Sequence, residues 1–175
     1  MTPVNLKNQT IMKEGFFKSL TKLKQELKPL EKSSVIEVEQ KYGIKFPKSY
    51  LDLLQFQNGG YLNYCQYPIR LLGIKVPFCD DFVTIRGICG IRNGSQDYDL
   101  EENTELLEEW ELDKSKYVTI DSDGHWWICF DKTQLNDNGE PKIVHIELEY
   151  GDSPVITVLS DNFENFINKL EPEDL

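Results

Sequence analysis

The stretch IEVEQKYGIKFPKSYLDLLQFQNGG, residues 36–60, decides the fold of this chain. Its apolar residues recur near helical spacing and predict two short helices, over 34–42 and 47–57. Gly43 follows the first helix, where a glycine commonly ends one, and the run Asn58-Gly59-Gly60 follows the second. We therefore expect a pair of helices that leads through a sharp turn into a different kind of structure.

Both helices carry start signals in the sequence. Ser34 is a favoured cap residue, and Glu37 follows it by three residues, which is the spacing of a capping box. Pro47 suits the first turn of the second helix, because an N–H at that position has no helical partner in any case. Tyr50 and the leucines after it predict that this second helix is mostly buried.

The sequence on either side of this stretch differs in character. Upstream, an apolar stripe predicts a helix over 12–27. Downstream, strands are expected over 61–67, 82–89, 117–120, 126–130, 143–146 and 155–158. Asp123-Gly124 and Asn138-Gly139 are typical of hairpin turns between such strands. A final helix is expected over 161–170.

This order of elements predicts a single α+β domain. A helical part (10–58), a sheet-rich part (60–158) and a C-terminal helix (160–170) follow one another. The helices are expected to flank a largely antiparallel sheet of about five or six strands.

The charge of the chain is unevenly distributed. Residues 1–50 have a net charge of +5 and residues 51–175 a net charge of −16, which together give −11. Such an acidic surface repels phosphate and attracts basic proteins, so we expect no direct contact with nucleic acid. The sequence shows no apolar run of 18 residues and no signal-peptide pattern, which predicts a cytoplasmic protein without membrane contact.

No residue pattern of an enzyme or a metal site is found. The four cysteines lack paired spacing and are expected to be free, reduced thiols: Cys65, Cys79, Cys89 and Cys129. A Cys129–His145 pair can be imagined, but ordinary strand residues explain both. The run from Asp121 to Gly124 resembles the start of a calcium loop and lacks the remaining ligands. We therefore expect no catalytic residue, no cofactor and no metal.

The acidic segment DYDLEENTELLEEWELD, residues 97–113, is the strongest candidate for a binding surface. It holds nine acids and no base, and it predicts a helix that Leu100, Leu106, Leu107 and Trp110 attach to the body. A solvated face and a docking surface for a basic partner both explain this pattern. The carboxylates proposed to bind a partner are Asp97, Asp99, Glu101, Glu102, Glu105, Glu108 and Glu109.

Two adjacent tryptophans are the second candidate. Trp126 and Trp127 lie in an expected strand, so their side chains should point to opposite faces of the sheet. One is expected in the core. The other is either covered by a helix or serves as an anchor for a partner, a role in which aromatic residues are favoured.

The order of several short motifs resembles the SUKH superfamily, which includes the yeast Smi/Knr cell-wall regulators. The first part of the pattern is Val38-Glu39, Tyr42-Gly43, Phe46-Pro47 with Tyr50, and Asn58-Gly59-Gly60. The stretch 120–131 is similar to the turn and strand of the family, and 159–167 is similar to its terminal helix. The resemblance covers roughly residues 33–170.

The resemblance implies a function in protein binding. Many bacterial SUKH proteins are immunity proteins that bind and neutralise a cognate toxin domain, often a nuclease. It therefore implies an immunity protein that occludes a basic toxin domain and performs no chemistry of its own. The alternative that it implies is a non-enzymatic regulatory or scaffold protein like the yeast cell-wall regulators.

Overall fold

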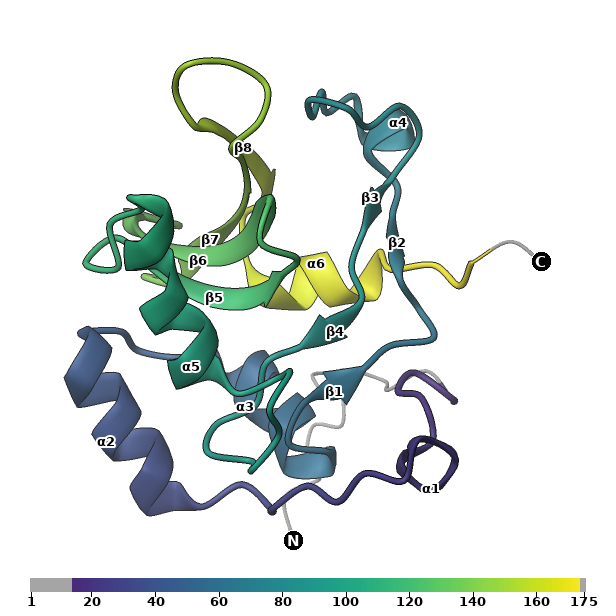
Figure 1. Ribbon diagram of the computed structural model, residues 1–175, viewed down its shortest axis with the longest axis vertical. Helices are drawn as coiled ribbons and strands as arrows, with labels where there is room; N and C mark the ends of the chain where they lie inside the picture. The colour runs from purple at the N-terminus through teal and green to yellow at the C-terminus, as the bar shows by residue number, and fades with distance from the viewer. Residues whose placement is uncertain (1–13, 174–175) are drawn as a thin grey trace, which may run out of the picture.

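The computed structural model describes residues 14–173, and it has an α+β fold (Figure 1). The helices are α1 (Leu20–Leu23), α2 (Lys32–Tyr42), α3 (Lys48–Phe56), α4 (Ile69–Leu72), α5 (Leu100–Glu105), the 3₁₀ helix η1 (Leu106–Trp110) and α6 (Phe163–Asn168). The strands are β1 (Gly60–Tyr61), β2 (Gln66–Tyr67), β3 (Val83–Thr84), β4 (Gly87–Ile88), β5 (Tyr117–Ser122), β6 (Trp126–Leu135), β7 (Pro141–Glu147) and β8 (Val155–Ser160).

The main sheet is an antiparallel meander of four strands in the order β5-β6-β7-β8. Its first two turns contain Gly124 and Gly139, both at positive φ, so the expected hairpins are confirmed. The other strands form two separate antiparallel ribbons, β1–β4 and β2–β3. The expected single sheet of five or six strands is therefore divided, because the segments 61–67 and 82–89 each form two short strands instead of one.

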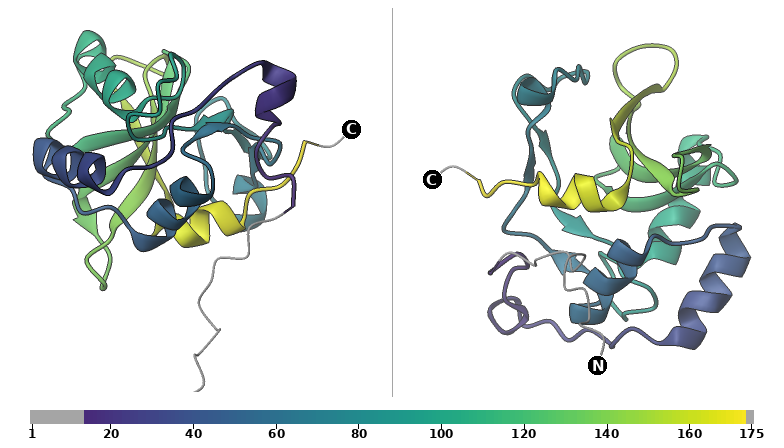
Figure 2. Two further views of the ribbon diagram at one scale, coloured as in Figure 1. Left: turned by 90° about the horizontal axis from the view of Figure 1, so that it is seen from below. Right: turned by 180° about the vertical axis from the view of Figure 1, so that it is seen from behind.

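Helices cover both faces of the main sheet (Figures 1 and 2). One face packs on α6 and the main core, which α3 also joins. The opposite face holds a smaller apolar cluster, in which Leu107 of η1 meets Trp127, Cys129 and Val144. Because side chains alternate along a strand, Trp126 and Trp127 face these two sides, as expected.

Tyr50 of α3 is the centre of the main core. Its ring lies 5.2 Å from those of Phe46 and Phe130 and 5.1 Å from that of Phe163, between ring centroids. Its hydroxyl donates a hydrogen bond of 2.6 Å to the carbonyl of Cys89. Ring pairs of this kind contribute about 0.5–1.5 kcal/mol each beyond their burial. The Pro-x-x-Tyr part of the sequence pattern thus joins α3 to the sheet and to α6.

The Asn58-Gly59-Gly60 turn is fixed by close packing against the residues that follow β4. The Asn58 amide donates to the carbonyls of Lys28 (3.0 Å) and Ile91 (2.9 Å). The Ile91 N–H donates back to the Asn58 side chain at 2.9 Å. Gly59 has φ +85°, and a Cβ there would lie 2.5 Å from the backbone nitrogen of Gly90. Only glycine fits at position 59, for both reasons.

The expected helix over 12–27 is wrong for the described residues, which begin at residue 14. Only the four residues of α1 are helical, and Lys24 ends them in the left-handed conformation. Phe16 and Phe17 are both buried, and Phe17 forms an isolated antiparallel bridge with Leu62. The Lys18 N–H donates to the Tyr61 carbonyl at 2.8 Å and the Asn63 N–H donates to the Phe16 carbonyl at 2.9 Å, so strand-like pairing with a distant segment takes the place of the expected helix.

The expected capping box is also wrong. Helix α2 begins at Lys32, and its cap residue, Glu31, makes no side-chain hydrogen bond to the helix. Ser34 lies inside the helix, and the Glu37 carboxylate instead forms an ion pair with Arg92. Glu37 therefore pairs with a distant arginine and does not cap its own helix. Gly43 ends the helix, as expected.

Residues 66–84 form an arm that the sequence did not predict. The ribbon β2–β3 carries α4 at its far end and projects beside the main sheet (Figures 1 and 2). At its base, Gln66 pairs with Glu171, which lies beyond α6. The arm also holds Cys79, and all four cysteines are free thiols, as expected.

Candidate functional site

The acidic segment 97–113 does not present one continuous face of unpaired carboxylates. Asp99, which directly precedes α5, is the N-cap of that helix. The Asp99 carboxylate accepts hydrogen bonds from the backbone N–H groups of Glu101 (3.0 Å) and Glu102 (3.3 Å). It is 8% exposed, so its main contribution is to start the helix.

Three of the predicted binding carboxylates, Glu101, Glu105 and Glu108, face bases of the same chain. Glu101 lies 3.2 Å from the Lys41 ammonium and 2.9 Å from the Arg92 guanidinium. Glu105 lies 3.2 Å from Lys41 and 2.6 Å from Lys114. The acidic helix is thus attached to α2 by charge pairs as well as by its buried leucines.

Glu105 is the most strongly held of these groups. Besides its lysine partners, it accepts a hydrogen bond of 2.7 Å from the Tyr42 hydroxyl at the end of α2. Hydrogen bonds from Lys114 and Tyr42 lower the pKa of Glu105 to about 2. Lys114 also pairs with Glu108 at 3.0 Å. Glu105 therefore stays ionised at physiological pH and connects two helices.

A different set of carboxylates surrounds Trp110, at the end of η1. Trp110 is 45% exposed and borders two hollows, of about 410 Å³ and about 380 Å³. Among residues 14–173, Arg86 is the only lysine or arginine that lines them. We use the name Trp110 surface for Trp110 and the six exposed carboxylates that line these hollows: Asp97, Glu109, Glu111, Asp123, Glu149 and Asp152.

Trp127 forms part of the wall of the second hollow. It is 1% exposed, and its ring centroid lies 5.9 Å from that of Trp110. Its indole N–H has no hydrogen-bond partner among the described residues. A buried donor without a partner is costly, so this N–H is an unused hydrogen-bonding group beside the Trp110 surface.

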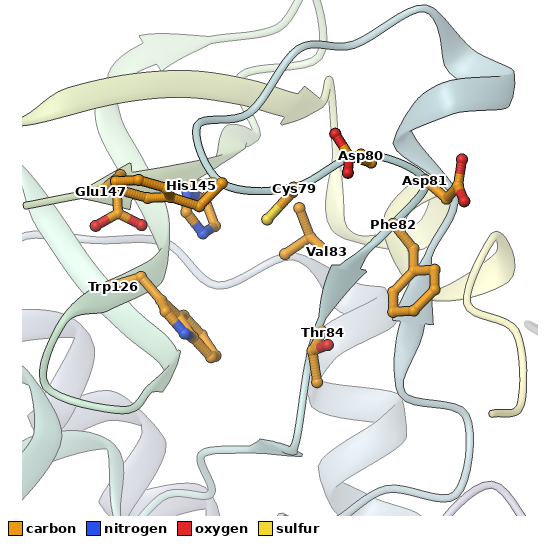
Figure 3. A pocket seen from close by; sticks show the side chains of 10 residues that line it. Cys79, Asp80, Asp81, Phe82, Val83, Thr84, Trp126, His145 and Glu147 are labelled. Carbon is orange, nitrogen blue, oxygen red and sulfur yellow. The ribbon is translucent and has the colours of Figure 1, made fainter. Parts of the chain in front are cut away.

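Trp126 lies in a separate cleft on the other face of the sheet, between β6, β7 and the arm (Figure 3). This arm cleft has a volume of about 500 Å³. The Trp126 ring stacks on the imidazole of His145 with centroids 5.9 Å apart. The guanidinium carbon of Arg86 also lies 5.9 Å from the Trp126 ring centre. Trp126 therefore packs partly on the main core and partly borders open space.

The nine residues predicted to bind a partner consequently lie in different places. Asp97 and Glu109 belong to the Trp110 surface and Trp127 to its wall, whereas Trp126 belongs to the arm cleft. Five others cap the helix, pair with bases of the chain or stand exposed beside them: Asp99, Glu101, Glu102, Glu105 and Glu108. Which of the nine contact a partner stays a prediction.

Sequence reasoning missed the exposed Trp110. Helical spacing assigned it and Leu106 to the buried side, but the chain tightens into a 3₁₀ helix at Leu106, and both side chains stand about 40% or more exposed. Asp123 and the loop that holds Glu149 and Asp152 reach Trp110 only through the tertiary fold. The only local signal was a tryptophan within a run of acids.

The imagined Cys129–His145 pair does not form. Cys129 lies in the apolar cluster with Trp127, whereas His145 stacks on Trp126 on the opposite face. Among residues 14–173, no group of three or more His, Cys, Asp or Glu side chains could hold a metal ion. Within the same residues, no helix has the length and apolar character needed to cross a membrane.

The sequence of residues 29–169 matches the model of the SMI1 / KNR4 family, also called SUKH-1. This chain belongs to that family. The resemblance to the SUKH superfamily, inferred from the order of the short motifs, is thereby confirmed. Among curated proteins, none gives a significant match.

The SMI1/KNR4 match spans most of what has been described above. It includes α2, α3 and the complete β5–β8 sheet. Both the Trp110 surface and the arm cleft are built from residues inside the matched range. Membership of this family points to a protein as the partner of the chain.

Proposed function

We propose that this protein is an immunity protein that binds a cognate bacterial toxin domain in the cytoplasm and neutralises it by occlusion. The observation that carries the proposal is the Trp110 surface, where six carboxylates surround an exposed indole. Membership of the SMI1/KNR4 family supports a function in protein binding. The proposal includes no chemical step on the part of this chain.

The partner that suits this surface is a basic protein. A nuclease domain carries positive charge where it holds phosphate, and an acidic protein can cover that region. Five of the six carboxylates have no ion-pair partner within residues 14–173, while Glu149 lies 2.8 Å from the His125 imidazole. The chain's own bases therefore cancel little of the field of this surface, which increases the rate of encounter. Trp110 adds a large aromatic side chain of the kind that anchors interfaces. Charge thus favours capture, and Trp110 favours retention.

The internal ion pairs decide which residues can test the proposal. Reversing Glu101 or Glu105 to lysine would place like charges beside Lys41 and Lys114, so a loss of binding could reflect a displaced α5. Glu109, Glu111 and Asp152 are better choices. They are exposed and form no ion pair within residues 14–173.

The experiment begins with capture of the partner from the native cell, followed by co-expression with that partner. The test variant carries Glu109→Lys, Glu111→Lys and Asp152→Lys. The control variant carries Glu14→Lys, Glu26→Lys and Glu173→Lys, which changes the net charge equally at exposed acids away from Trp110. Wild type and control should protect cells from the toxin. The test variant should lose protection while its thermal unfolding stays unchanged.

A second variant separates charge from anchoring. Trp110→Ala should weaken binding by about 30-fold or more, mainly through faster dissociation, if the indole is a central contact. Full protection by both the triple variant and Trp110→Ala would remove the Trp110 surface from the proposal. Capture of a signalling or cell-wall component, with no toxicity to suppress, would replace the immunity function by a regulatory one.

A further inference from the structure

The arm cleft lies on the face of the β5–β8 sheet opposite the Trp110 surface, and the proposed function does not use it. Figure 3 shows Trp126, His145 and Glu147 on the sheet side, with Cys79 and Val83 facing them from the arm. The cleft volume of about 500 Å³ lies within the range of about 300–1,000 Å³ that is typical of ligand sites. The cleft is therefore large enough for one long side chain.

Two of the three carboxylates that line the cleft form no ion pair among the described residues. Asp81 pairs with the Arg70 guanidinium at 2.9 Å. Asp80 and Glu147 have no ion pair among residues 14–173, and both lie close enough to Cys79 to help raise the pKa of its thiol, for which burial is the main cause. Glu147 is 5% exposed, and a backbone N–H at residue 149 donates to its carboxylate at 3.0 Å. An almost buried carboxylate without a cation favours the entry of one.

His145 is a buried, uncharged side chain in the wall of the same cleft. Its side chain lines the cleft, yet the residue is only 1% exposed, and Nδ1 has no hydrogen-bond partner among the described residues. Burial lowers the pKa of His145 to about 4, so the ring is neutral at physiological pH. A neutral imidazole has one bare nitrogen that accepts a hydrogen bond. It does not repel a cation.

Aromatic rings complete the walls. Phe78 and Phe82 on the arm are 72% and 40% exposed, and together with Trp126 of β6 they belong to the lining of the cleft. The guanidinium carbon of Arg86 lies 5.9 Å from the Trp126 ring centre, so this ring already contacts one guanidinium of the chain itself. Exposed aromatic side chains beside unpaired carboxylates favour a group that is both flat and positively charged.

We propose that the arm cleft binds a guanidinium group, presented as an arginine side chain of a protein partner. Its N–H donors meet the Glu147 carboxylate, the Asp80 carboxylate on the arm adds negative charge at the rim of the cleft, and its plane packs on the aromatic lining. The two oxygens of one carboxylate match the paired donors of a guanidinium better than the single ammonium group of a lysine. Arginine is also more weakly hydrated and therefore loses less on entering an aromatic cleft.

The test is a titration of the full ¹⁵N-labelled chain with three capped tripeptides, Gly-Arg-Gly, Gly-Lys-Gly and Gly-citrulline-Gly. Backbone signals of residues 78–84 and the Trp126 indole signal report on the cleft. The arginine peptide should give saturable shifts there. The citrulline peptide, which keeps the shape and removes the charge, should bind at least about tenfold more weakly. The lysine peptide should bind less tightly than the arginine peptide.

Two matched variants locate the binding. Glu147→Gln keeps the size of the side chain and removes its charge, and it should weaken the arginine peptide about tenfold. Asp137→Asn removes one charge at an exposed turn residue outside the cleft and should leave the affinity unchanged. Asp80→Asn, on the exposed loop, serves if Glu147→Gln unfolds the chain, and it should also weaken binding.

The inference is overturned if the arginine peptide gives no saturable shifts at the cleft. It is also overturned if the citrulline or lysine peptide binds equally well, or if the folded Glu147 and Asp80 variants bind like wild type. Because no toxin takes part in the titration, its outcome is independent of the rescue experiment. Failure of one leaves the other standing.

Discussion

Asp121 and His145 are buried residues whose pKa values are both shifted so that the uncharged form is favoured. Asp121 on β5 is 0% exposed; one carboxylate oxygen accepts a hydrogen bond of 2.8 Å from the Arg86 N–H, and the other has no partner among the described residues. Burial raises the pKa of Asp121 to about 7. Burial lowers the pKa of His145 to about 4. Both shifts reflect the cost of holding a charge inside the core.

These shifts act on stability in opposite directions over one pH range. Between pH 3.8 and about 7 the folded state keeps the Asp121 proton that the unfolded state has lost, so its contribution to stability falls as pH rises. Between pH 6.5 and about 4 the unfolded state takes up a proton at His145 that the folded state refuses, so this contribution falls as pH decreases. The two largely cancel in the wild type.

Asp121→Asn should remove the pH dependence of stability that comes from Asp121 and leave that of His145. We compare the free energy of unfolding of the variant with that of wild type at pH 5 and at pH 8. This difference should shift in favour of the variant by roughly 3 kcal/mol from pH 5 to pH 8, because wild type must bury a charged carboxylate at the higher pH. Urea unfolding at the two pH values measures this difference. Asp137→Asn, at an exposed turn residue, is the control with the same charge change. A relative stability of Asp121→Asn that is equal at both pH values would contradict the pKa shift.

At the scale of elements, the junction between α3 and β1 depends on close contact of two backbones. Gly59→Ala would bring a Cβ to 2.5 Å from the Gly90 nitrogen and 2.7 Å from the Ile88 carbonyl oxygen, at φ +85°. Neither backbone atom can move without displacing β4. We expect a loss of about 3 kcal/mol or more, or failure to fold.

Gly139→Ala is the matched control for this prediction. Gly139 has φ +77°, but no atom of the described part of the chain lies within 4 Å of a Cβ built there. The control should lose only the cost of the left-handed conformation, about 1 kcal/mol. Thermal and urea unfolding of both variants separate the cost of a positive φ from the cost of the steric clash with Gly90. Equal losses of stability in the two variants would show that packing against Gly90 contributes nothing.

Elements with a regular apolar period could be predicted from the sequence, and those held by distant partners could not. Helices α2 and α3 and the strands β5–β8 follow the expected ranges closely, because one face of each is buried in a single core. The upstream helix failed because Phe17 pairs with Leu62, far along the chain. The arm was missed because its strands are two residues long and hold no period.

At the scale of the whole molecule, the carboxylates fall into two groups. Some form ion pairs within the chain, and others are exposed and contribute to the electrostatic field around the protein. Glu101 and Glu105 are balanced by Lys41, Arg92 and Lys114, so they add little to long-range attraction. The carboxylates of the Trp110 surface have no such lysine partners among residues 14–173. The sequence predicted an acidic surface, but only the fold decides which of its charges remain unpaired.

This division predicts how salt affects capture of a basic partner. The association rate of the wild type should fall as salt is added, since exposed charges are screened beyond about 8 Å at physiological ionic strength. The triple variant of Glu109, Glu111 and Asp152 should associate more slowly at low salt and lose most of this dependence. Stopped-flow mixing with the captured partner measures both rates. A salt dependence that the triple variant retains in full would assign the steering to other carboxylates.

The sequential order of the meander also bears on how the chain acquires its structure during synthesis. Each strand of β5-β6-β7-β8 pairs with its neighbour in sequence, so this half can fold through short-range contacts once it has left the ribosome. Tyr50 leaves the ribosome earlier, and its ring partners Phe130 and Phe163 follow 80 and more residues later. The apolar face of the N-terminal helices therefore stays exposed until these partners have been synthesised. At that stage a nascent chain is most prone to aggregate.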